Sequence, residues 1–241
     1  MNISGLQKTT LLDYPGHVAA TIFLGGCNFR CPFCHNMNIV LEASQEYTKE
    51  DILKFLTKRS GVLDGVCITG GEPTLYNDLP DFIQEIKKIT KQDGSTFLVK
   101  LDTNGTNPDM LKGLIDSKLI DYVAMDIKSS LGKYDLVAGI SEDNKKTEEI
   151  LEAVNKSVNI LKASKIDYEF RTTLVDKYHD EEEIIKIGEL INGAKKYYMQ
   201  SFIDSENVID HSLGSIEKDV LLKYLEIMKK YVDYVSIRGV D

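Results

Sequence analysis

The sequence predicts an α/β fold, a partial (β/α)6-type barrel of parallel strands with helices outside. Two observations support this prediction. Apolar β-type runs alternate with helical patterns over roughly six units, which is typical of parallel strands connected by helices. Polar and glycine-rich motifs follow four consecutive predicted strands, as active-site residues do at the carboxyl rim of a β/α barrel. The alternation alone would also fit a doubly wound open sheet, so the barrel depends on the second observation.

The predicted strands are short apolar runs bounded by turn residues. The first, His17–Leu24, follows a turn at Pro15-Gly16. The others are, in chain order, Gly65–Thr69, Thr96–Leu101, Tyr122–Ile127, Tyr168–Leu174, Lys196–Phe202 and Tyr234–Ile237.

The predicted helices lie between these strands and show apolar residues at helical spacing. In Tyr47–Ser60, Thr48 suits the N-cap and Asp51 follows in the first turn, while Pro108 suits the first turn of Asn107–Ser117. The remaining helices are Leu79–Thr90, Thr147–Ser164, Asp180–Asn192 and Ser215–Lys230. Because no linker, repeat or low-complexity tract interrupts the pattern, we expect a single domain over residues 1–241.

Composition excludes several classes of protein. The 241 residues are 42% hydrophobic and 28% charged, as in ordinary globular proteins. No apolar stretch approaches the roughly 20 residues of a membrane span, so no membrane contact is expected. The net charge of −9, without a Lys/Arg block, argues against nucleic acid as a partner. The opening MNISGLQKTT does not resemble a signal peptide, which argues against a secreted chain. A cytoplasmic protein is expected, because a reducing cytoplasm suits exposed, cluster-binding thiols.

Three of the four cysteines, Cys27, Cys31 and Cys34, lie within the eight residues CNFRCPFC. Three thiolates can bind one face of an iron–sulfur cube, whereas a structural cluster or a zinc site has four protein ligands. The fourth ligand would be Cys67 or a molecule other than protein, and the spacing favours the second. Cys67 lies among apolar residues in GVCIT, which predicts a small core residue. Disulfides would need a secreted chain, and zinc would need a second Cys/His pair.

The cysteine motif, followed by GGEP at residues 70–73, resembles the radical S-adenosylmethionine (SAM) superfamily. CHN after the third cysteine, DTNG at 102–105 and MDIK at 125–128 resemble the activating enzymes of glycyl radical enzymes. The opening GLQKTTLLDYPGHVAATIFLGGC and the ending VSIRG resemble the subgroup that activates anaerobic ribonucleoside-triphosphate reductase. The resemblance therefore covers nearly the whole chain.

This resemblance implies that Cys27, Cys31 and Cys34 hold three irons of a 4Fe–4S cluster and that SAM chelates the fourth iron. Reductive cleavage of SAM then gives methionine and a 5′-deoxyadenosyl radical. The implied partners are a glycyl radical enzyme, with the anaerobic ribonucleotide reductase favoured, and an electron donor such as flavodoxin or ferredoxin. Alternatives are the activase of another glycyl radical enzyme, such as pyruvate formate-lyase, and a radical SAM enzyme for a small molecule, similar to carboxydeazaguanine synthase. An iron–sulfur carrier or zinc module would have little use for the rim motifs.

The resemblance also assigns cofactor-binding positions. These are Phe33, His35, Gly70, Gly71, Glu72, Asp102, Thr103, Asn104, Asp126, Lys128 and Arg171. Glu72 is expected to bind the SAM ammonium group, and the two glycines to let the backbone approach SAM. Phe33 is expected near the adenine or as a buried loop anchor, and His35 near the adenine or as a loop cap.

Asp102 and Asp126 end neighbouring predicted strands, where two unpaired carboxylates would repel each other. In the resembling activases such carboxylates help to hold a monovalent cation beside SAM. A methionine that contributes to that site in the family is replaced here by Ala124, which weakens the prediction of a cation. Arg171 lies within the strand YEFRTTLV, where an unpaired charge would be costly, so a cofactor or substrate contact is expected.

Overall fold

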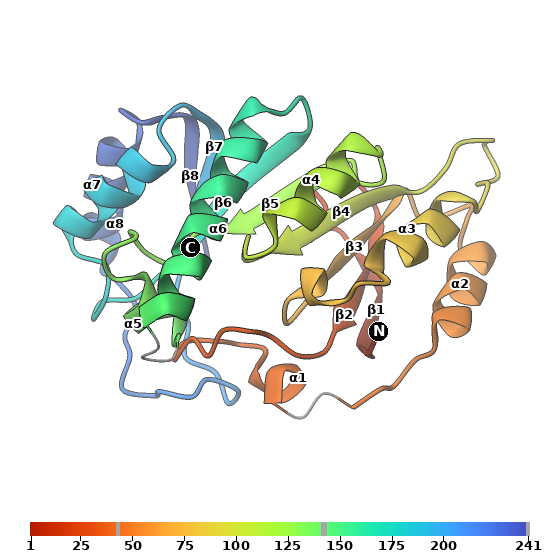
Figure 1. The fold of residues 1–241 in the computed structure, drawn as a ribbon, viewed down its shortest axis with the longest axis horizontal. Coiled ribbons are helices and arrows are strands. Elements are labelled where there is room, and N and C mark those ends of the chain that lie inside the picture. The colour runs from red at the N-terminus through yellow and green to blue at the C-terminus, as the bar shows by residue number, and fades with distance from the viewer. Residues whose placement is uncertain (42–43, 141–143, 240–241) are drawn as a thin grey trace. The chain divides into compact units, whose positions relative to one another are not determined.

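A computed structural model describes residues 1–41, 44–140 and 144–239, and Figure 1 shows the order of their elements. The chain divides into two compact units. The first comprises Met1–Asn28, Asn38–Thr103 and Asp109–Val123, and the second comprises Phe29–Met37, Asn104–Pro108 and the chain from Ala124 onwards. The single domain expected over residues 1–241 stays a prediction.

The first unit is built on parallel strands with one antiparallel strand at the edge. β1 (Ile3–Thr10) is antiparallel to β2 (Ala19–Leu24), which is followed by two parallel neighbours, β3 (Gly65–Gly70) and β4 (Leu98–Thr103). The register pairs Leu24 with Gly70, so β2 and β3 end level with each other. The connecting elements are α1 (Met37–Leu41), α2 (Lys49–Lys58), η1 (Pro73–Leu75), α3 (Leu79–Lys87) and α4 (Pro108–Asp116).

Local sequence explains where these helices begin and which side they bury. Thr48 Oγ1 accepts a hydrogen bond from Asp51 N at 3.1 Å, and Asp51 Oδ2 accepts one from Thr48 N at 3.0 Å. This capping box confirms the predicted N-cap of α2. The apolar stripe of α3 is completely buried, as the 3.6-residue period requires. It consists of Leu79, Phe82, Ile83 and Ile86.

The second unit repeats the strand–helix alternation. Its strands β6 (Asp167–Leu174), β7 (Ala194–Ser201) and β8 (Val232–Arg238) are parallel neighbours in chain order. β5 (Tyr122–Asp126) begins in the first unit and ends in the second. The helices are α5 (Tyr134–Ala138), α6 (Asn144–Ala163), α7 (Glu181–Leu190) and α8 (Lys218–Met228), of which α7 packs against α8 (Figure 1).

The predicted α/β class is confirmed, and the strand order follows chain order from β1 to β8. All seven predicted strands and all six predicted helices are found, with ends that differ by a few residues. β1, α1, η1 and α5 were not predicted. β1 shows little alternation and has three consecutive exposed residues, Gln7, Lys8 and Thr9, so its strand structure depends on its pairing with β2.

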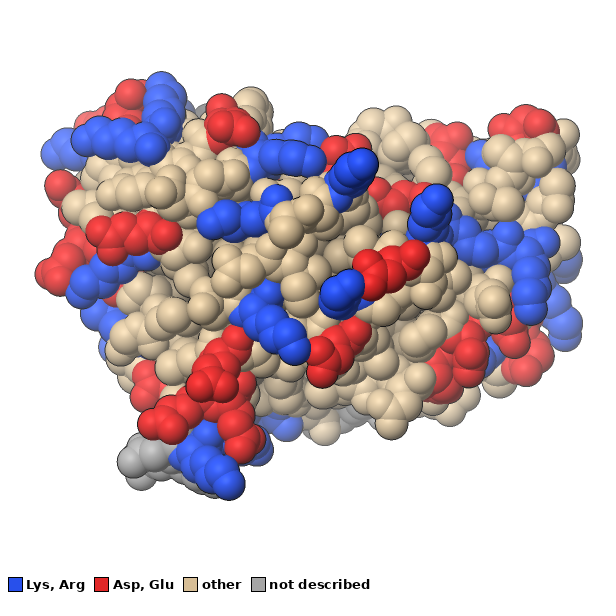
Figure 2. All heavy atoms as spheres, turned by 45° about the horizontal axis from the view of Figure 1, so that its top comes forward, with Lys and Arg blue, Asp and Glu red and all other residues tan. Residues whose placement is uncertain are grey.

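The described helices and the surface agree with the composition. Within the ranges given above, no helix is long and apolar enough to cross a membrane. On the face drawn in Figure 2, acidic and basic side chains are interspersed with uncharged ones rather than separated by sign.

Candidate functional site

The first cysteine follows a glycine turn whose backbone is held at several points. Gly25 N donates to Asn2 O at 3.1 Å, and Tyr76 Oη donates to Gly25 O at 2.7 Å. Gly26 N donates to Ile39 O at 2.8 Å, and its φ of +80° lies in the region that favours glycine. The turn between β2 and Cys27 therefore has a defined shape.

The glycines of the GGEP motif let the end of β3 approach this turn. Gly71 N donates to Leu24 O and Glu72 N donates to Gly26 O, both at 2.8 Å. A Cβ on Gly71 would lie 1.8 Å from Gly26 O, and a Cβ on Gly70 would lie 2.2 Å from Leu24 O. Side chains are thus excluded here by backbone contact within the first unit. The predicted approach of this backbone to SAM stays a prediction.

The carboxylate of Glu72 is completely buried and binds groups of the protein itself. Its Oε1 accepts hydrogen bonds from Thr74 N at 3.0 Å, from Thr74 Oγ1 at 2.5 Å and from Thr103 Oγ1 at 2.8 Å. Glu72 therefore caps η1 and joins it to the end of β4. This role comes in addition to the expected contact with the SAM ammonium group, which stays a prediction.

Asp102 forms a buried ion pair that was not predicted from the sequence. Lys100 Nζ lies 2.7 Å from Asp102 Oδ1, and the side chains of Lys100 and Asp102 are 3% and 14% exposed. The Cys67 sulfur is 3.8 Å from both groups, so this core cysteine has polar neighbours as well as apolar ones. The available signal was a lysine within an otherwise apolar strand, two residues before the aspartate.

Asn104 also uses its side chain locally. Its Oδ1 accepts hydrogen bonds from Thr106 N at 3.0 Å and from Thr106 Oγ1 at 2.7 Å. These bonds shape the loop after β4 in the way that asparagine commonly does in turns. A contact of Thr103 or Asn104 with a cofactor stays a prediction.

Cys31 and Cys34 lie in a loop of the second unit that packs against α5. Arg30 N donates to Ala138 O at 2.9 Å, and the Cys31 sulfur lies 3.6 Å from the same oxygen. A Cβ on Gly139 would lie 2.2 Å from Arg30 O, so this approach also needs glycine. Asn36 N points at the Cys34 sulfur from 3.4 Å, which is an interaction that stabilises a thiolate.

Phe33 and His35 anchor this loop. Phe33 is buried, with its ring centre 6.4 Å from that of Tyr178. The His35 ring stacks on Phe202 at 5.7 Å, and its Nε2 lies 2.8 Å from Ile203 O. Both side chains therefore contact other parts of the protein, and their predicted position near the adenine stays a prediction.

The cysteines are chemically suited to bind an iron–sulfur cluster. All four are thiols rather than disulfides, and Cys27 and Cys34 are partly exposed. Cys27 belongs to the first unit, while Cys31 and Cys34 belong to the second. In the described part of the chain no three His, Cys, Asp or Glu side chains are already grouped as a metal site. The soft sulfur donors, the Asn36 amide and the nearby Lys128 charge suit iron–sulfur ligation.

Asp126, Lys128 and Arg171 form an ionic cluster at the ends of β5 and β6. Lys128 Nζ is 3.0 Å from Asp126 Oδ2, and Arg171 Nε is 2.9 Å from Asp126 Oδ1. Burial alone would raise the pKa of Asp126, but the charges of Arg171 and Lys128 outweigh it and lower the pKa to about 2. Burial would lower the pKa of Lys128, but Asp126 and then Cys31 raise it above its usual value.

The ion pairs of Asp102 and Asp126 remove one reason to expect a monovalent cation. The expected repulsion assumed that Asp102 and Asp126 were unpaired. Each carboxylate has a cationic partner in its own unit, Lys100 for Asp102 and Lys128 with Arg171 for Asp126. A cation is therefore not needed to neutralise them, and its presence stays a prediction.

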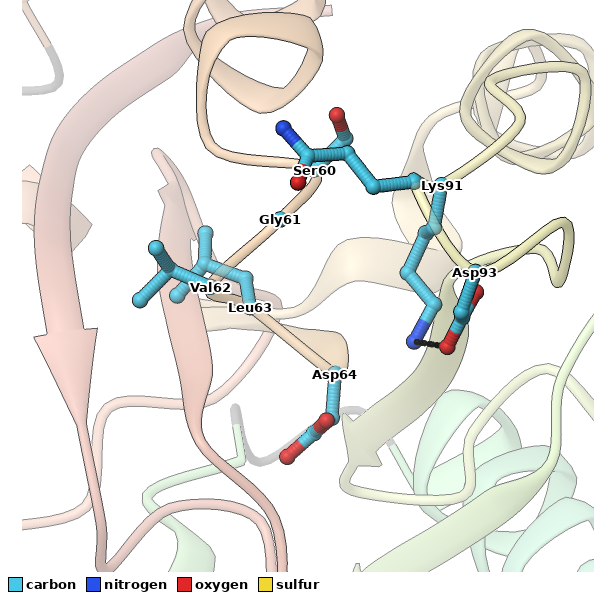
Figure 3. A pocket seen from close by; sticks show the side chains of 8 residues that line it. Ser60, Gly61, Val62, Leu63, Asp64, Lys91 and Asp93 are labelled. Carbon is cyan, nitrogen blue, oxygen red and sulfur yellow. Dashed lines mark ion pairs between the residues drawn. The ribbon is translucent and has the colours of Figure 1, made fainter.

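A separate hollow lies in the first unit, away from the predicted residues. Figure 3 shows that it is lined by residues 60–64 and 91–93, with Lys91 Nζ 3.7 Å from Asp93 Oδ2. These segments precede β3 and β4, whereas the motif residues follow the carboxyl ends of the strands. The hollow contains none of the predicted site residues.

Comparison with known proteins matches the motifs to a family. The profile described as "Radical SAM superfamily" matches residues 21–191. A protein of Methanocaldococcus jannaschii, named as a glycyl-radical enzyme activating enzyme, is 37% identical over 99% of this chain and 96% of its own length. The pyruvate formate-lyase-activating enzyme of Clostridium pasteurianum is 31% identical over 52% of each chain.

The fold is similar to solved structures at low sequence identity. Streptococcus suis SuiB superposes with a TM-score of 0.60 at 12% identity, covering 91% of this chain. The chain spans about half the length of SuiB, 48%. This likeness concerns the fold alone.

We predict that Gly71→Ala is strongly destabilising, because its Cβ would overlap the Gly26 carbonyl oxygen. Overpacking against rigid backbone typically costs about 1–3 kcal/mol in the free energy of unfolding. The matched control is Gly113→Ala, since Gly113 is helical with no atom within 4 Å of the added Cβ. The control should be neutral or stabilised by up to about 1 kcal/mol. Equal effects in denaturant unfolding would contradict the proposed close approach.

We predict that Asp126→Asn lowers stability by about 2 kcal/mol at neutral pH, from the shift of its pKa from 3.8 to about 2. A carboxyl group with a lowered pKa stabilises the fold above the ordinary pKa. The difference between wild type and variant should therefore shrink as the pH falls from about 4 towards 2. Asp116→Asn, in an exposed helical pair with Lys112, should change stability by less than about 0.5 kcal/mol. A difference that does not depend on pH would argue against the paired carboxylate.

Proposed function

Because the chain belongs to the radical SAM superfamily and to the glycyl-radical enzyme activating enzymes within it, we propose that it generates a glycyl radical on an anaerobic ribonucleoside-triphosphate reductase. As a member of this superfamily it is an enzyme that uses a 4Fe–4S cluster and SAM. The near-complete match to a glycyl-radical enzyme activating enzyme is the observation that carries the proposal. The choice of reductase is supported by the opening GLQKTTLLDYPG and the ending VSIRG.

The cluster would be held by Cys27, Cys31 and Cys34. Together with SAM it supplies one-electron cleavage of a carbon–sulfur bond, which protein side chains cannot perform. The chain itself supplies shape and charge. Backbone contacts hold the turn before Cys27, and α5 holds the loop at Arg30 and Cys31. The Asn36 amide lies 3.4 Å from the Cys34 sulfur, and the Lys128 ammonium group interacts electrostatically with Cys31.

SAM carries an amino group, a carboxylate, a ribose and a positive sulfonium. The Asp126, Lys128 and Arg171 cluster offers both signs of charge, with Lys128 and Arg171 suited to the carboxylate or ribose. The chain holds these charges in place before SAM binds. Prior orientation of this kind lowers the cost of ordering a bound cofactor.

The proposed activity needs an electron donor, a partner enzyme and a reducing compartment. A reduced flavodoxin or ferredoxin would supply the electron. A reducing cytoplasm would keep the exposed thiols of Cys27 and Cys34 available. Pyruvate formate-lyase is the second candidate partner, since half of the chain matches the activating enzyme of C. pasteurianum.

We predict that the anaerobically reconstituted protein binds about four irons per chain. Its reduced electron paramagnetic resonance signal should shift when SAM is added, because an open iron accepts the cofactor. Cys27→Ala, Cys31→Ala and Cys34→Ala should each abolish the shift, while Cys67→Ala should retain it. An unchanged shift in any of the first three variants would remove that cysteine from the proposed ligand set.

We predict a doublet glycyl radical signal when the reduced protein and SAM are mixed with the reductase without oxygen. Methionine and 5′-deoxyadenosine should form in step with the signal. The control is a reductase with alanine in place of its radical-bearing glycine, which should give no doublet. A doublet with pyruvate formate-lyase alone would reassign the partner, and SAM cleavage triggered only by a small metabolite would reject the activase.

A further inference from the structure

Two buried side chains of the second unit hold the backbone that carries Lys128. His179 lies in the loop after β6, and Glu183 lies in the first turn of α7. Their exposed fractions are 1% and 0%. Neither residue was among the predicted site residues. Because a buried carboxylate is costly unless it is hydrogen-bonded, the partners of Glu183 indicate its role.

Glu183 binds the residues that follow Lys128. Its Oε1 accepts hydrogen bonds from Ser129 Oγ at 2.6 Å and from Ser130 N at 2.5 Å. An acidic residue at this helix position usually reaches back to the N-cap backbone. Here Asp180 caps the helix through Glu183 N at 2.8 Å, and the Glu183 side chain turns to the serines. Burial would raise the pKa of Glu183, but hydrogen bonds from Ser129 and Ser130 lower it, so the carboxylate stays charged.

His179 binds Lys128 directly. His179 Nδ1 lies 3.0 Å from Val175 N, which can only donate, and 3.3 Å from Val175 O, which can only accept. The shorter contact makes Nδ1 the acceptor of the neutral ring, so Nε2 carries the proton. Nε2 therefore donates to Lys128 O at 3.0 Å. Burial lowers the pKa of His179, which keeps the ring neutral as this arrangement requires. Tyr224 Oη donates to His179 O at 3.0 Å and holds the histidine backbone from α8.

The segment from Lys128 to Ser130 is thus held at one carbonyl, one hydroxyl and one amide. The Lys128 side chain leaves this fixed backbone, and its ammonium group meets Asp126. We propose that His179 and Glu183 are positioning residues for SAM, because they fix the Lys128 backbone and with it the place of the Lys128 ammonium group. This inference rests on the proposed function, in which Lys128 and Asp126 contact SAM.

Two substitutions of His179 separate its two hydrogen bonds. His179→Gln can retain a donor near the Nε2 position towards Lys128 O. His179→Asn can retain an acceptor near the Nδ1 position for Val175 N but loses the donor. With equal iron content, His179→Asn should bind SAM roughly tenfold more weakly than wild type, as expected for one lost hydrogen bond, and His179→Gln should remain within about threefold. Glu183→Ala should weaken binding like His179→Asn.

A second measurement needs neither cluster nor SAM. Amide hydrogen exchange of residues 127–133 in the cofactor-free protein should be faster in His179→Asn and Glu183→Ala than in wild type and His179→Gln. A double-mutant cycle then tests whether His179 acts through Lys128. In a Lys128→Met background, His179→Asn should weaken SAM binding by less than about twofold further.

The outcomes distinguish this inference from the function on which it rests. If the cluster-loaded wild type binds SAM and both His179 variants bind it with the wild-type affinity, the positioning role is rejected and the proposed function stands. A tenfold effect of His179→Asn that persists in the Lys128→Met background also rejects it. If the cluster-loaded wild type does not bind SAM at all, the proposed function fails and the inference fails with it.

Discussion

The close approach of β3 to β2 is the constraint on which the first half of the candidate site depends. The Leu24 and Gly26 carbonyl oxygens each receive a hydrogen bond from the GGEP backbone, and this leaves no room for a Cβ at Gly70 or Gly71. The glycines therefore couple two loops that are more than 40 residues apart in sequence. Once β3 is in register, the turn before Cys27 has a fixed shape. In the second unit, the Arg30 carbonyl oxygen likewise leaves no room for a Cβ at Gly139.

Charge within each unit follows a common arrangement. An aspartate at a strand end is paired with a lysine two residues away, Lys100 before Asp102 and Lys128 after Asp126. The Lys100–Asp102 pair is largely buried and the Lys128–Asp126 pair partly buried. Removing one partner leaves a charge that is poorly compensated, so the two members of each pair fix one another's position. Asp126 differs because Arg171 adds a second positive charge, which leaves this cluster with an excess of positive charge. That excess suits a carboxylate ligand and the thiolate of Cys31.

The alternation of strands and helices could be predicted from sequence because parallel strands buried on both faces give continuous apolar runs. The position of the cysteine and rim motifs could also be predicted, because each motif follows the carboxyl end of a predicted parallel strand.

The strand β1 could not be predicted from sequence. Its exposed residues show no hydrophobic alternation, and its strand structure comes from pairing with β2. His179 and Glu183 could not be identified, because a histidine or a glutamate looks the same in sequence whether it is solvated or buried against a loop. Lys100 did leave a signal, since it interrupts an apolar run two residues before Asp102.

Many of the motif side chains form hydrogen bonds within the protein itself. Glu72 caps a turn, Asn104 shapes a loop and His35 joins the cysteine loop to the segment after β7. A residue bound in this way cannot move freely to meet SAM, but it holds neighbouring backbone groups in a fixed geometry. Fixed backbone amides and carbonyls suit a cofactor that must be oriented before an electron arrives, since their orientation costs no further entropy. The motif residues and the positioning pair His179 and Glu183 therefore have a common physical role, which is to fix loops that follow the carboxyl ends of the strands.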